Sequence, residues 1–322
     1  MQMLRKPRSI LREWLLGPWD LAYQWTLGLE DPQSDVSVWL HGLGPARDVT
    51  ESHLMACGSP FTICIGFDQK DDSSIRSAEH LTLHFYENSG HQRLGEIKLG
   101  FVSSLRVDSQ TLCFFRAVAS RNYCLPRRYL WPRSLRNSLQ QRSAKDGDVP
   151  ITARESRAMA VFYVCPRPVV LVSVADGQEG NMFPMNVMGP VGNGYFAFGL
   201  NSSRSAAPLV ERAGRAVLSS IPFERASMAT SLRTNHRKSS IDWNQLPFAT
   251  STPQGFGVPV PDFAMRIREM QVEAIHKLGS HTLFVSKTIR DKWLTKGPQF
   301  FVAHGIYHAW LQRTGLDRNK PD

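Results

Sequence analysis

The segment from Arg167 to Val187 has the composition of a strand, a polar turn and a returning strand. A continuous apolar run precedes the turn at Asp176–Gly180. Pro184 has no N–H for a β ladder, so the returning strand is predicted to be an edge or a break. Free N–H and C=O groups at such an edge can bind a flat heteroaromatic ring, and Asn181 and Asn186 add side-chain amides. A hairpin that simply ends at a proline is the alternative.

A hydroxyl-rich turn with one arginine, Asn201–Ser205, has the composition of an anion site. It follows a predicted strand and leads into a predicted helix, in which Ser205 is the N-cap, Pro208 lies in the first turn and Gly214 is near the end. The N–H groups at a helix N-terminus point toward an anion, and Arg204 can pair with it, so the turn suits a phosphate. An ordinary capping cluster would have the same composition.

Histidines supply the remaining candidate groups. Gly279 predicts a turn that presents His281 at the start of a strand, where its ring can hydrogen-bond a cofactor or donate to a reduced ring; a structural histidine is the alternative. His304 and His308 can share a helix face, but no third metal ligand is spaced with them, so we predict no metal site. The polar segment Thr230–Asn244 is interpreted as a solvated loop, with a cover over the pocket as the alternative.

In chain order, these motifs resemble the flavin reductase-like, FMN-binding split-barrel family, from near Glu155 to near Gly315. The resemblance rests on Arg167-Pro168, Asn181-Met-Phe-Pro184, the Ser202–Ser205 turn, Val217-Leu-Ser-Ser-Ile-Pro222 and Gly279-Ser-His281-Thr-Leu-Phe-Val. It implies a six-stranded Greek-key split β-barrel that is usually dimeric. It also implies FMN at the subunit interface, with NADH or NADPH as the reductant.

The resemblance also implies site residues by position. The isoalloxazine would be lined by Asn181, Phe183, Pro184, Met185, Asn186 and Val187, and flanked by Ser219, Ser220, Ile221 and Pro222. The ribityl phosphate would be held by Asn201, Ser202, Ser203, Arg204 and Ser205. His281 would be the catalytic residue, near the flavin and the nicotinamide. The position before it is often acidic in the family and is Ser280 here, which leaves the choice between NADH and NADPH open.

Short runs of β-branched and aromatic residues separated by turns also fill the N-terminal part of the chain. Val36–Leu40, Phe61–Phe67 and Leu81–Tyr86 are examples, and they predict an antiparallel β domain. We therefore predict a mainly β protein with four parts: a helical extension at 1–30, a smaller β-rich domain of unknown role at 31–125, a basic linker at 126–154 and the split barrel at 155–318. The two halves can be related barrels, although their sequences do not align by eye.

Bulk composition limits the class of protein. The 322 residues carry a formal net charge of +10, which favours anionic partners such as a phosphorylated cofactor, nucleic acid or an acidic membrane. Five cysteines without a CxxC pair predict buried, reduced thiols and a cytoplasmic protein. No run of about 18 apolar residues predicts a membrane span.

Together, these features predict an FMN-dependent oxidoreductase of the NAD(P)H:flavin reductase type. We expect a homodimer that passes electrons to a monooxygenase or another acceptor and that binds neither membrane nor nucleic acid. Two alternatives stay open: a flavin-binding or interaction protein without turnover, and a basic β-barrel module that binds nucleic acid.

Overall fold

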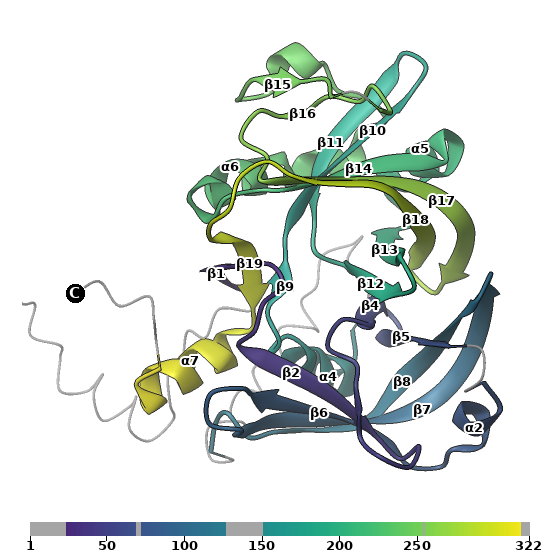
Figure 1. Cartoon of the computed structure of the whole chain (residues 1–322), viewed down its shortest axis with the longest axis vertical. Helices are drawn as coiled ribbons and strands as arrows, with labels where there is room; N and C mark the ends of the chain where they lie inside the picture. Colours follow the sequence, from purple (N-terminus) through teal and green to yellow (C-terminus); the bar gives the residue numbers. More distant parts are fainter. Residues whose placement is uncertain (1–23, 69–71, 127–150, 254, 317–322) are drawn as a thin grey trace, which may run out of the picture.

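The structure, a computed structural model, describes residues 24–68, 72–126, 151–253 and 255–316. This part of the chain is mainly β, as predicted, and consists of two large antiparallel sheets with short helices around them (Figure 1). Most of the predicted helical extension at 1–30 and nearly all of the basic linker at 126–154 lie outside the described residues. The described end of the extension is not helical but forms strand β1 (Trp25–Leu29).

The N-terminal sheet has seven strands in the order β3-β2-β6-β7-β8-β5-β4. Burial alternates along β2 and β6, so every second side chain points into the core, as the sequence pattern predicts. Helix α2 (Asp72–Ser77) follows β5. The strands are β2 (Val36–His41), β3 (Arg47–Asp48), β4 (His53–Cys57), β5 (Thr62–Asp68), β6 (Leu81–Glu87), β7 (Arg93–Val107) and β8 (Gln110–Asn122).

The C-terminal sheet also has seven strands, one more than expected, in the order β11-β10-β14-β17-β18-β13-β12. Strand β11 is at the edge, which confirms the position predicted from Pro184. Helix α5 (Ala206–Ala213) follows Ser205 and ends at Gly214, which has a left-handed φ of 61°. The strands are β10 (Val170–Asp176), β11 (Glu179–Met185), β12 (Met188–Gly192), β13 (Tyr195–Asn201), β14 (Arg215–Ser220), β17 (Arg266–Leu278) and β18 (His281–Trp293).

Segments that are distant in the chain connect the two sheets. Strand β19 lies between β1 and β9 in a small three-stranded sheet. Helix α4 begins with a capping box between Thr152 and Glu155, and the Glu155 carboxylate also accepts the Phe61 N–H at 2.8 Å, which fixes the helix to the N-terminal half. These elements are β1 (Trp25–Leu29), α4 (Ala153–Phe162), β9 (Arg167–Pro168), β19 (Gln299–Ala303) and α7 (Gly305–Thr314).

The chain between β14 and β17 forms an insert of short elements, and the predicted solvated loop Thr230–Asn244 is part of it. The Asn181 side chain donates to the carbonyl oxygens of Asn235 and Lys238 at 3.0 and 2.8 Å, and Asn235 donates to the Met182 carbonyl at 2.9 Å. Because Asn181 and Asn235 are buried, these bonds fix the insert onto the edge strand β11. The elements are η2 (Phe223–Arg225), α6 (Ala226–Ser231), η3 (Leu232–Arg237), η4 (Trp243–Gln245), β15 (Thr250–Ser251) and β16 (Val260–Pro261).

A fully buried apolar layer lies between the two sheets. The residues that form it come from both halves, and they include Ala56, Cys64, Leu112 and Phe114 together with Val191, Ala197, Leu283 and Val285. A large apolar side chain contributes about 1.5–3 kcal/mol when it is fully buried, so the layer joins the halves into one packed unit. All five cysteines are buried and free, as predicted.

Candidate functional site

A cavity of about 480 Å³ opens where the edge strand β11 meets the insert and the entrance to α5. This volume falls within the range of roughly 300–1,000 Å³ that is typical of small-molecule sites. The lining residues are Pro184 and Met185 of β11, Asn186 and Val187 directly after it, Gly199, Leu200 and Asn201 of β13, Arg204, His281, and Arg233, Thr234, His236 and Arg237 of η3. We call this the edge-strand cavity.

The edge-strand cavity is strongly cationic. Arg204, Arg233 and Arg237 line it, and its lining contains no aspartate or glutamate. Within residues 24–68, 72–126, 151–253 and 255–316, none of these three guanidinium groups has a carboxylate partner. Guanidinium groups bind phosphate through paired, charge-assisted hydrogen bonds. The cavity therefore has the donor set of a phosphate site.

Local hydrogen bonds hold the Asn201–Ser205 side of the cavity in shape. The backbone N–H and hydroxyl of Ser203 both donate to Asn201 Oδ1, at 2.9 and 2.7 Å. The Ser202 hydroxyl lies 2.9 Å from that of Thr282, and the Ser205 hydroxyl donates to the Arg237 carbonyl at 3.0 Å. Ser202, Ser203 and Ser205 thus shape the turn rather than line the cavity, and Ser205 attaches η3 to the helix entrance.

Two histidines complete the cavity wall. His236 Nε2 donates to the Pro184 carbonyl at 2.8 Å, and its ring packs on Phe183 with a centroid distance of 4.6 Å. Burial lowers the pKa of His236, and Arg204 and Arg233 add to that effect against the opposing hydrogen bond to Pro184. Burial also lowers the pKa of His281 to about 4. Both rings are therefore neutral at pH 7.

The environment of His281 selects one tautomer. The Gly58 backbone N–H, which can only donate, points at His281 Nδ1 at 3.4 Å. The Ser280 hydroxyl also lies 2.8 Å from Nδ1. Nδ1 is therefore the acceptor, and the neutral ring carries its proton on Nε2.

The structure brings the two predicted halves of the site together. Pro184, Met185, Asn186, Val187, Asn201, Arg204 and His281 all line the same cavity. Asn181 and Phe183 lie behind this lining: Asn181 anchors the insert and Phe183 packs against the His236 ring.

The four residues that were expected to flank the ring, Ser219, Ser220, Ile221 and Pro222, lie outside the cavity. Strand β14 runs between β10 and β17, so its backbone is paired on both sides, and Ser219 is fully buried opposite Leu171 and Ile267. The insert that follows β14 takes the place beside the edge strand instead.

The insert supplies four lining residues: Arg233, Thr234, His236 and Arg237. The sequence favoured a solvated loop for this segment, and the alternative of a cover over the pocket is the one that the structure supports. The buried amides of Asn181 and Asn235, together with the bond from His236 to Pro184, distinguish this fixed wall from a free loop. The Gly58 contact to His281 had no sequence signal, because it depends on how the two sheets pack.

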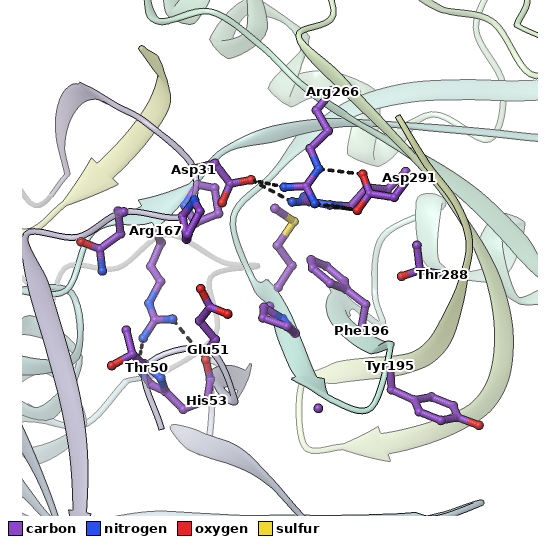
Figure 2. Close-up of a pocket in the computed structure, with 18 of the residues that line it drawn as sticks. Asp31, Thr50, Glu51, His53, Arg167, Tyr195, Phe196, Arg266, Thr288 and Asp291 are labelled. Carbon is purple, nitrogen blue, oxygen red and sulfur yellow. Dashed lines mark hydrogen bonds and ion pairs between the residues drawn. The ribbon is translucent and has the colours of Figure 1, made fainter. Parts of the chain in front are cut away.

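A second cavity, of about 460 Å³, lies between the two halves, and Figure 2 shows the side chains around it. Arg266 and Arg268 face this cavity, and both bind Asp31 and Asp291, with Arg266 donating to Asp291 through two nitrogens at 2.6 and 2.7 Å. Burial favours a higher pKa for Asp291, but the hydrogen bonds and charges of the two arginines lower it overall. The two positive charges of the arginines and the two negative charges of the aspartates thus neutralise each other within the protein.

A fifth charged group of this second cavity, Arg167, is buried and contacts His53 rather than a carboxylate. It donates to the His53 carbonyl at 3.2 Å and to the imidazole Nε2, and its guanidinium lies 4.4 Å from the centre of the Phe162 ring. Burial, followed by the charge of Arg167, lowers the pKa of His53, which keeps that ring neutral. Arg167 thus ties the start of the C-terminal half to β4.

His304 and His308 do not share a site. His304 caps α7 by accepting the Ile306 N–H at 3.1 Å, whereas the His308 ring stacks on Trp25 at 4.2 Å. In the part of the chain that the structure covers, no three His, Cys, Asp or Glu side chains gather closely enough to bind a metal ion. Among the same residues, no helix has the length and apolar character needed to cross a membrane.

The model of the family described as "Flavin reductase like domain" matches residues 162–300. This match confirms the predicted resemblance: residues 162–300 form a flavin reductase-like domain, and it supports a flavin-binding, reductase-type oxidoreductase function. No curated protein matches the chain.

Similar solved structures include three that cover less than half of this chain. The first is an FMN-binding protein from Thermus thermophilus, with 22% identity, a TM-score of 0.35 and coverage of 40% of this chain and 71% of that one. The second is the NADH:FAD oxidoreductase SgcE6 from Streptomyces globisporus, with 15% identity, a TM-score of 0.41 and coverage of 46% and 88%. The third is BorF, the flavin reductase component of a bacterial two-component tryptophan halogenase, with 16% identity, a TM-score of 0.40 and coverage of 46% and 92%.

Proposed function

We propose that this protein binds FMN in the edge-strand cavity and reduces it with NADH or NADPH. One observation carries the proposal: inside a flavin reductase-like domain, three arginines without carboxylate partners among the described residues meet the end of an edge strand in one cavity. The proposal extends the family match, which supports flavin binding and reductase-type chemistry without specifying the flavin or the reductant.

The chemistry of the donor set fits FMN. Arg204, Arg233 and Arg237 would hold the phosphate, a group for which an uncompensated guanidinium cluster is suited. The segment Pro184–Val187 would lie along the flat ring, since it is the end of an edge strand and lines the cavity. Its Pro184 and Val187 carbonyls already accept from His236 and Gly199, so Met185 and Asn186 are the backbone positions that would face the ring. The cavity volume of about 480 Å³ is adequate for a ligand of this class.

When bound, FMN would supply the redox chemistry by accepting a hydride from the nicotinamide. The chain's own residues would bind and orient the flavin and exclude water from it. Neutral His281, with its proton on Nε2, can donate one hydrogen bond to a ligand without adding charge. The absence of charge at His281 leaves the cation cluster as the main electrostatic attraction for the phosphate.

A titration tests the proposal. Apo-protein is titrated with FMN and followed by flavin fluorescence, and NADH and NADPH oxidation is then measured on the loaded protein. Arg204→Ala should weaken FMN binding by about ten- to a hundred-fold, the range for a charge-assisted hydrogen bond of about 1.5–3 kcal/mol. His281→Ala should bind FMN and lose turnover.

The matched control is Arg212→Ala, because Arg212 lies on α5 and pairs with Asp176 and Glu179 outside the cavity. This variant should bind FMN like the unmodified protein. If Arg204→Ala and His281→Ala both leave binding and turnover unchanged, the site is elsewhere. Flavin binding without oxidation of either nicotinamide would contradict the reductase activity.

A further inference from the structure

The N-terminal and C-terminal sheets have the same topology. Numbered along the chain within each sheet, the seven strands follow the same spatial order in both: second, first, fifth, sixth, seventh, fourth, third. The N-terminal strands in chain order are β2, β3, β4, β5, β6, β7 and β8, and their C-terminal equivalents are β10, β11, β12, β13, β14, β17 and β18. A helix follows the fourth strand in each half, α2 in one and α5 in the other. Seven strands and a helix that recur with the same neighbours indicate two copies of one fold.

The strand registers assign equivalent residues in the two copies. Gly66 lies opposite Leu112 in the N-terminal sheet, and Gly199 lies opposite Leu283 in the C-terminal sheet. The Gly66 N–H donates to the Ser52 carbonyl and the Gly199 N–H donates to the Val187 carbonyl, both at 2.8 Å. By the same registers, the apolar layer between the sheets consists of equivalent pairs: Cys64 with Ala197, Leu112 with Leu283, and Phe114 with Val285.

The contacts between the copies are reciprocal. A Cβ added at Gly66 would overlap the carbonyl oxygen of Val191 in the other half, and one added at Gly199 would lie 3.1 Å from the carbonyl oxygen of Ala56. Ala56 and Val191 occupy equivalent places in β4 and β12. An interface in which each side contacts the other through the same patch is the signature of a two-fold arrangement. The chain therefore packs like a dimer of two related domains.

The ends of the long hairpins extend this symmetry to His281. Val107 pairs with Gln110 at one hairpin end and Leu278 pairs with His281 at the other, so Gln110 is the equivalent of His281. Gln110 accepts from the Asn193 side chain of the other half at 2.7 Å. In the same way, His281 accepts from Gly58 of the other half. Each hairpin end is thus held by the opposite copy.

Among the residues that the structure describes, only those of the C-terminal copy have the features of a ligand site. Asp68 pairs with Gln110 in the N-terminal copy, and Asn201 pairs with His281 in the C-terminal copy, so Asp68 is the equivalent of Asn201. The N-terminal copy therefore has a carboxylate at the position where the C-terminal copy begins its proposed phosphate site. The N-terminal copy also has no insert: β6 and β7 are joined by the turn at residues 88–92, whereas the insert supplies Arg233 and Arg237 to the C-terminal cavity. A phosphate would meet a negative charge and no arginine from an insert in the N-terminal copy.

We propose that the N-terminal half acts as a built-in second subunit that binds no flavin itself and positions His281 of the C-terminal half through the turn Cys57–Pro60. This inference rests on the proposed function. The family resemblance implies a flavin between two chains. Here the lining of the edge-strand cavity comes from the C-terminal half, and the N-terminal half contributes the turn that holds His281 from behind, as a partner subunit would. The protein is accordingly a monomer that binds one FMN, in place of the homodimer expected from the resemblance.

The turn Cys57–Pro60 contacts the Gly279–His281 corner through several independent bonds. Ser280 N–H donates to the Ser59 carbonyl at 2.9 Å, and the Ser59 N–H donates to the Ser280 hydroxyl at 3.3 Å. A Cβ at Gly279, which has a φ of 50°, would lie 2.5 Å from the Ser59 carbonyl oxygen. This close approach leaves His281 one orientation, with Nδ1 toward Gly58. Gly58 is therefore a positioning residue for His281.

Sedimentation equilibrium of the full chain, with an FMN titration on the same sample, tests the built-in subunit. We expect the mass of a monomer and one FMN per chain. A homodimer that binds FMN would overturn this inference and leave the proposed function standing. A monomer that binds no FMN would overturn the proposed function and leave the two-copy arrangement standing.

Gly58→Ala and Gly58→Val test the positioning. Gly58 has no positive φ, so its backbone accepts a side chain, but a Cβ there lies 3.2 Å from His281 Cε1. We expect kcat to fall by about ten-fold or more, with the Kd for FMN and the KM for the nicotinamide unchanged, because small displacements of a group at the reaction centre are costly. Gly90→Ala is the control, since its Cβ would meet nothing closer than 3.5 Å.

Nitrogen NMR of His281 supplies a readout that needs no flavin. The unmodified protein should show the ring protonated on Nε2, and Gly58→Val should show a mixture of tautomers. A thermal unfolding transition at the same temperature as that of the unmodified protein would confirm that the variants fold. If the tautomer and kcat both stay unchanged in Gly58→Val, Gly58 does not position His281.

Discussion

Two cavities of nearly equal volume, about 480 and 460 Å³, differ in how their arginines are compensated. In the cavity between the halves, Arg266 and Arg268 bind Asp31 and Asp291, and Figure 2 shows the bonds from Arg266 to both carboxylates. The third arginine of that cavity, Arg167, is bound to His53. In the edge-strand cavity, the arginines have no carboxylate partner among the described residues. Cavity volume therefore does not distinguish a ligand site from a cavity that is part of the packing. What distinguishes the two cavities is whether carboxylates within the protein neutralise the arginines.

The largest effect on stability should come from Arg266→Ala. This change leaves Asp31, which is half-buried, and Asp291, which is exposed, with Arg268 as their remaining partner, and we expect a loss of about 2 kcal/mol, below the 3–5 kcal/mol of a fully buried pair. Chemical denaturation measures the change. FMN affinity should stay the same. A loss of FMN affinity without a loss of stability would invert the comparison between the cavities.

Arg233→Ala and Arg237→Ala should each weaken FMN binding by about ten-fold, or ~1.4 kcal/mol, because each removes one of the charged donors from the edge-strand cavity. Fluorescence titration at low and high salt measures the effect, and the salt dependence should be shallower in the variants. Arg212→Ala again serves as the control, and an equal loss in that variant would mean that net charge alone attracts the flavin.

The two cavities should also respond to pH in separate windows. Burial lowers the pKa of His281 to about 4, against about 6.5 in the unfolded chain. Below pH 6.5 the unfolded chain binds a proton that the folded chain excludes, so stability falls as the pH drops from about 6.5 to about 4. Urea denaturation between pH 7 and pH 4 measures this slope, which should be less steep in His281→Gln.

Asp291 titrates in the same sense as His281 but in a lower pH window. Its pKa is lowered in the folded protein, so its contribution is complete above the ordinary value of 3.8 and is lost only as the pH falls further. Asp291→Asn should therefore leave the slope between pH 6.5 and pH 4 unchanged. A change of slope in that window would show that the network around Arg266 is coupled to the histidines.

The smallest effect should be that of Arg204→Ala on stability. Removing a cation that has no carboxylate partner among the described residues leaves no charge stranded, so we expect a change within about 0.5 kcal/mol, as for an ordinary surface substitution. Thermal melting without ligand measures it. A large destabilisation would show that Arg204 is a structural residue.

The sequence was sufficient for local features with a distinct chemical cause. Pro184 predicted the edge strand because a proline cannot donate, and Gly214 predicted the end of α5 because glycine adopts a left-handed φ. Helix α5 begins after Ser205 as predicted, but Ser205 is itself helical and its hydroxyl donates to the Arg237 carbonyl, so it does not cap the helix. The convergence of Asn201, Arg204 and Pro184–Val187 followed from the family resemblance rather than from spacing.

Long-range packing could not be predicted in the same way. A basic run such as the one at Arg233 and Arg237 is solvated in most contexts, and it becomes a cavity wall here because Asn181 and Asn235 bind it to β11. A relation between the two halves was raised from the sequence, but no alignment of residues supported it, because strand order can persist when residue types do not. Cys64 and Ala197, or Phe114 and Val285, are equivalent in place without being similar in shape.

The central claim is that the arginines of the edge-strand cavity recognise a flavin through its phosphate. Binding of FMN and of riboflavin, which lacks the phosphate, to the unmodified protein and to Arg204→Ala tests it directly. We predict that the unmodified protein binds FMN at least about ten-fold more tightly than riboflavin, and that Arg204→Ala removes most of this preference while riboflavin affinity stays the same. Equal affinities for the two flavins in the unmodified protein, or an equal loss of both in Arg204→Ala, would contradict the claim.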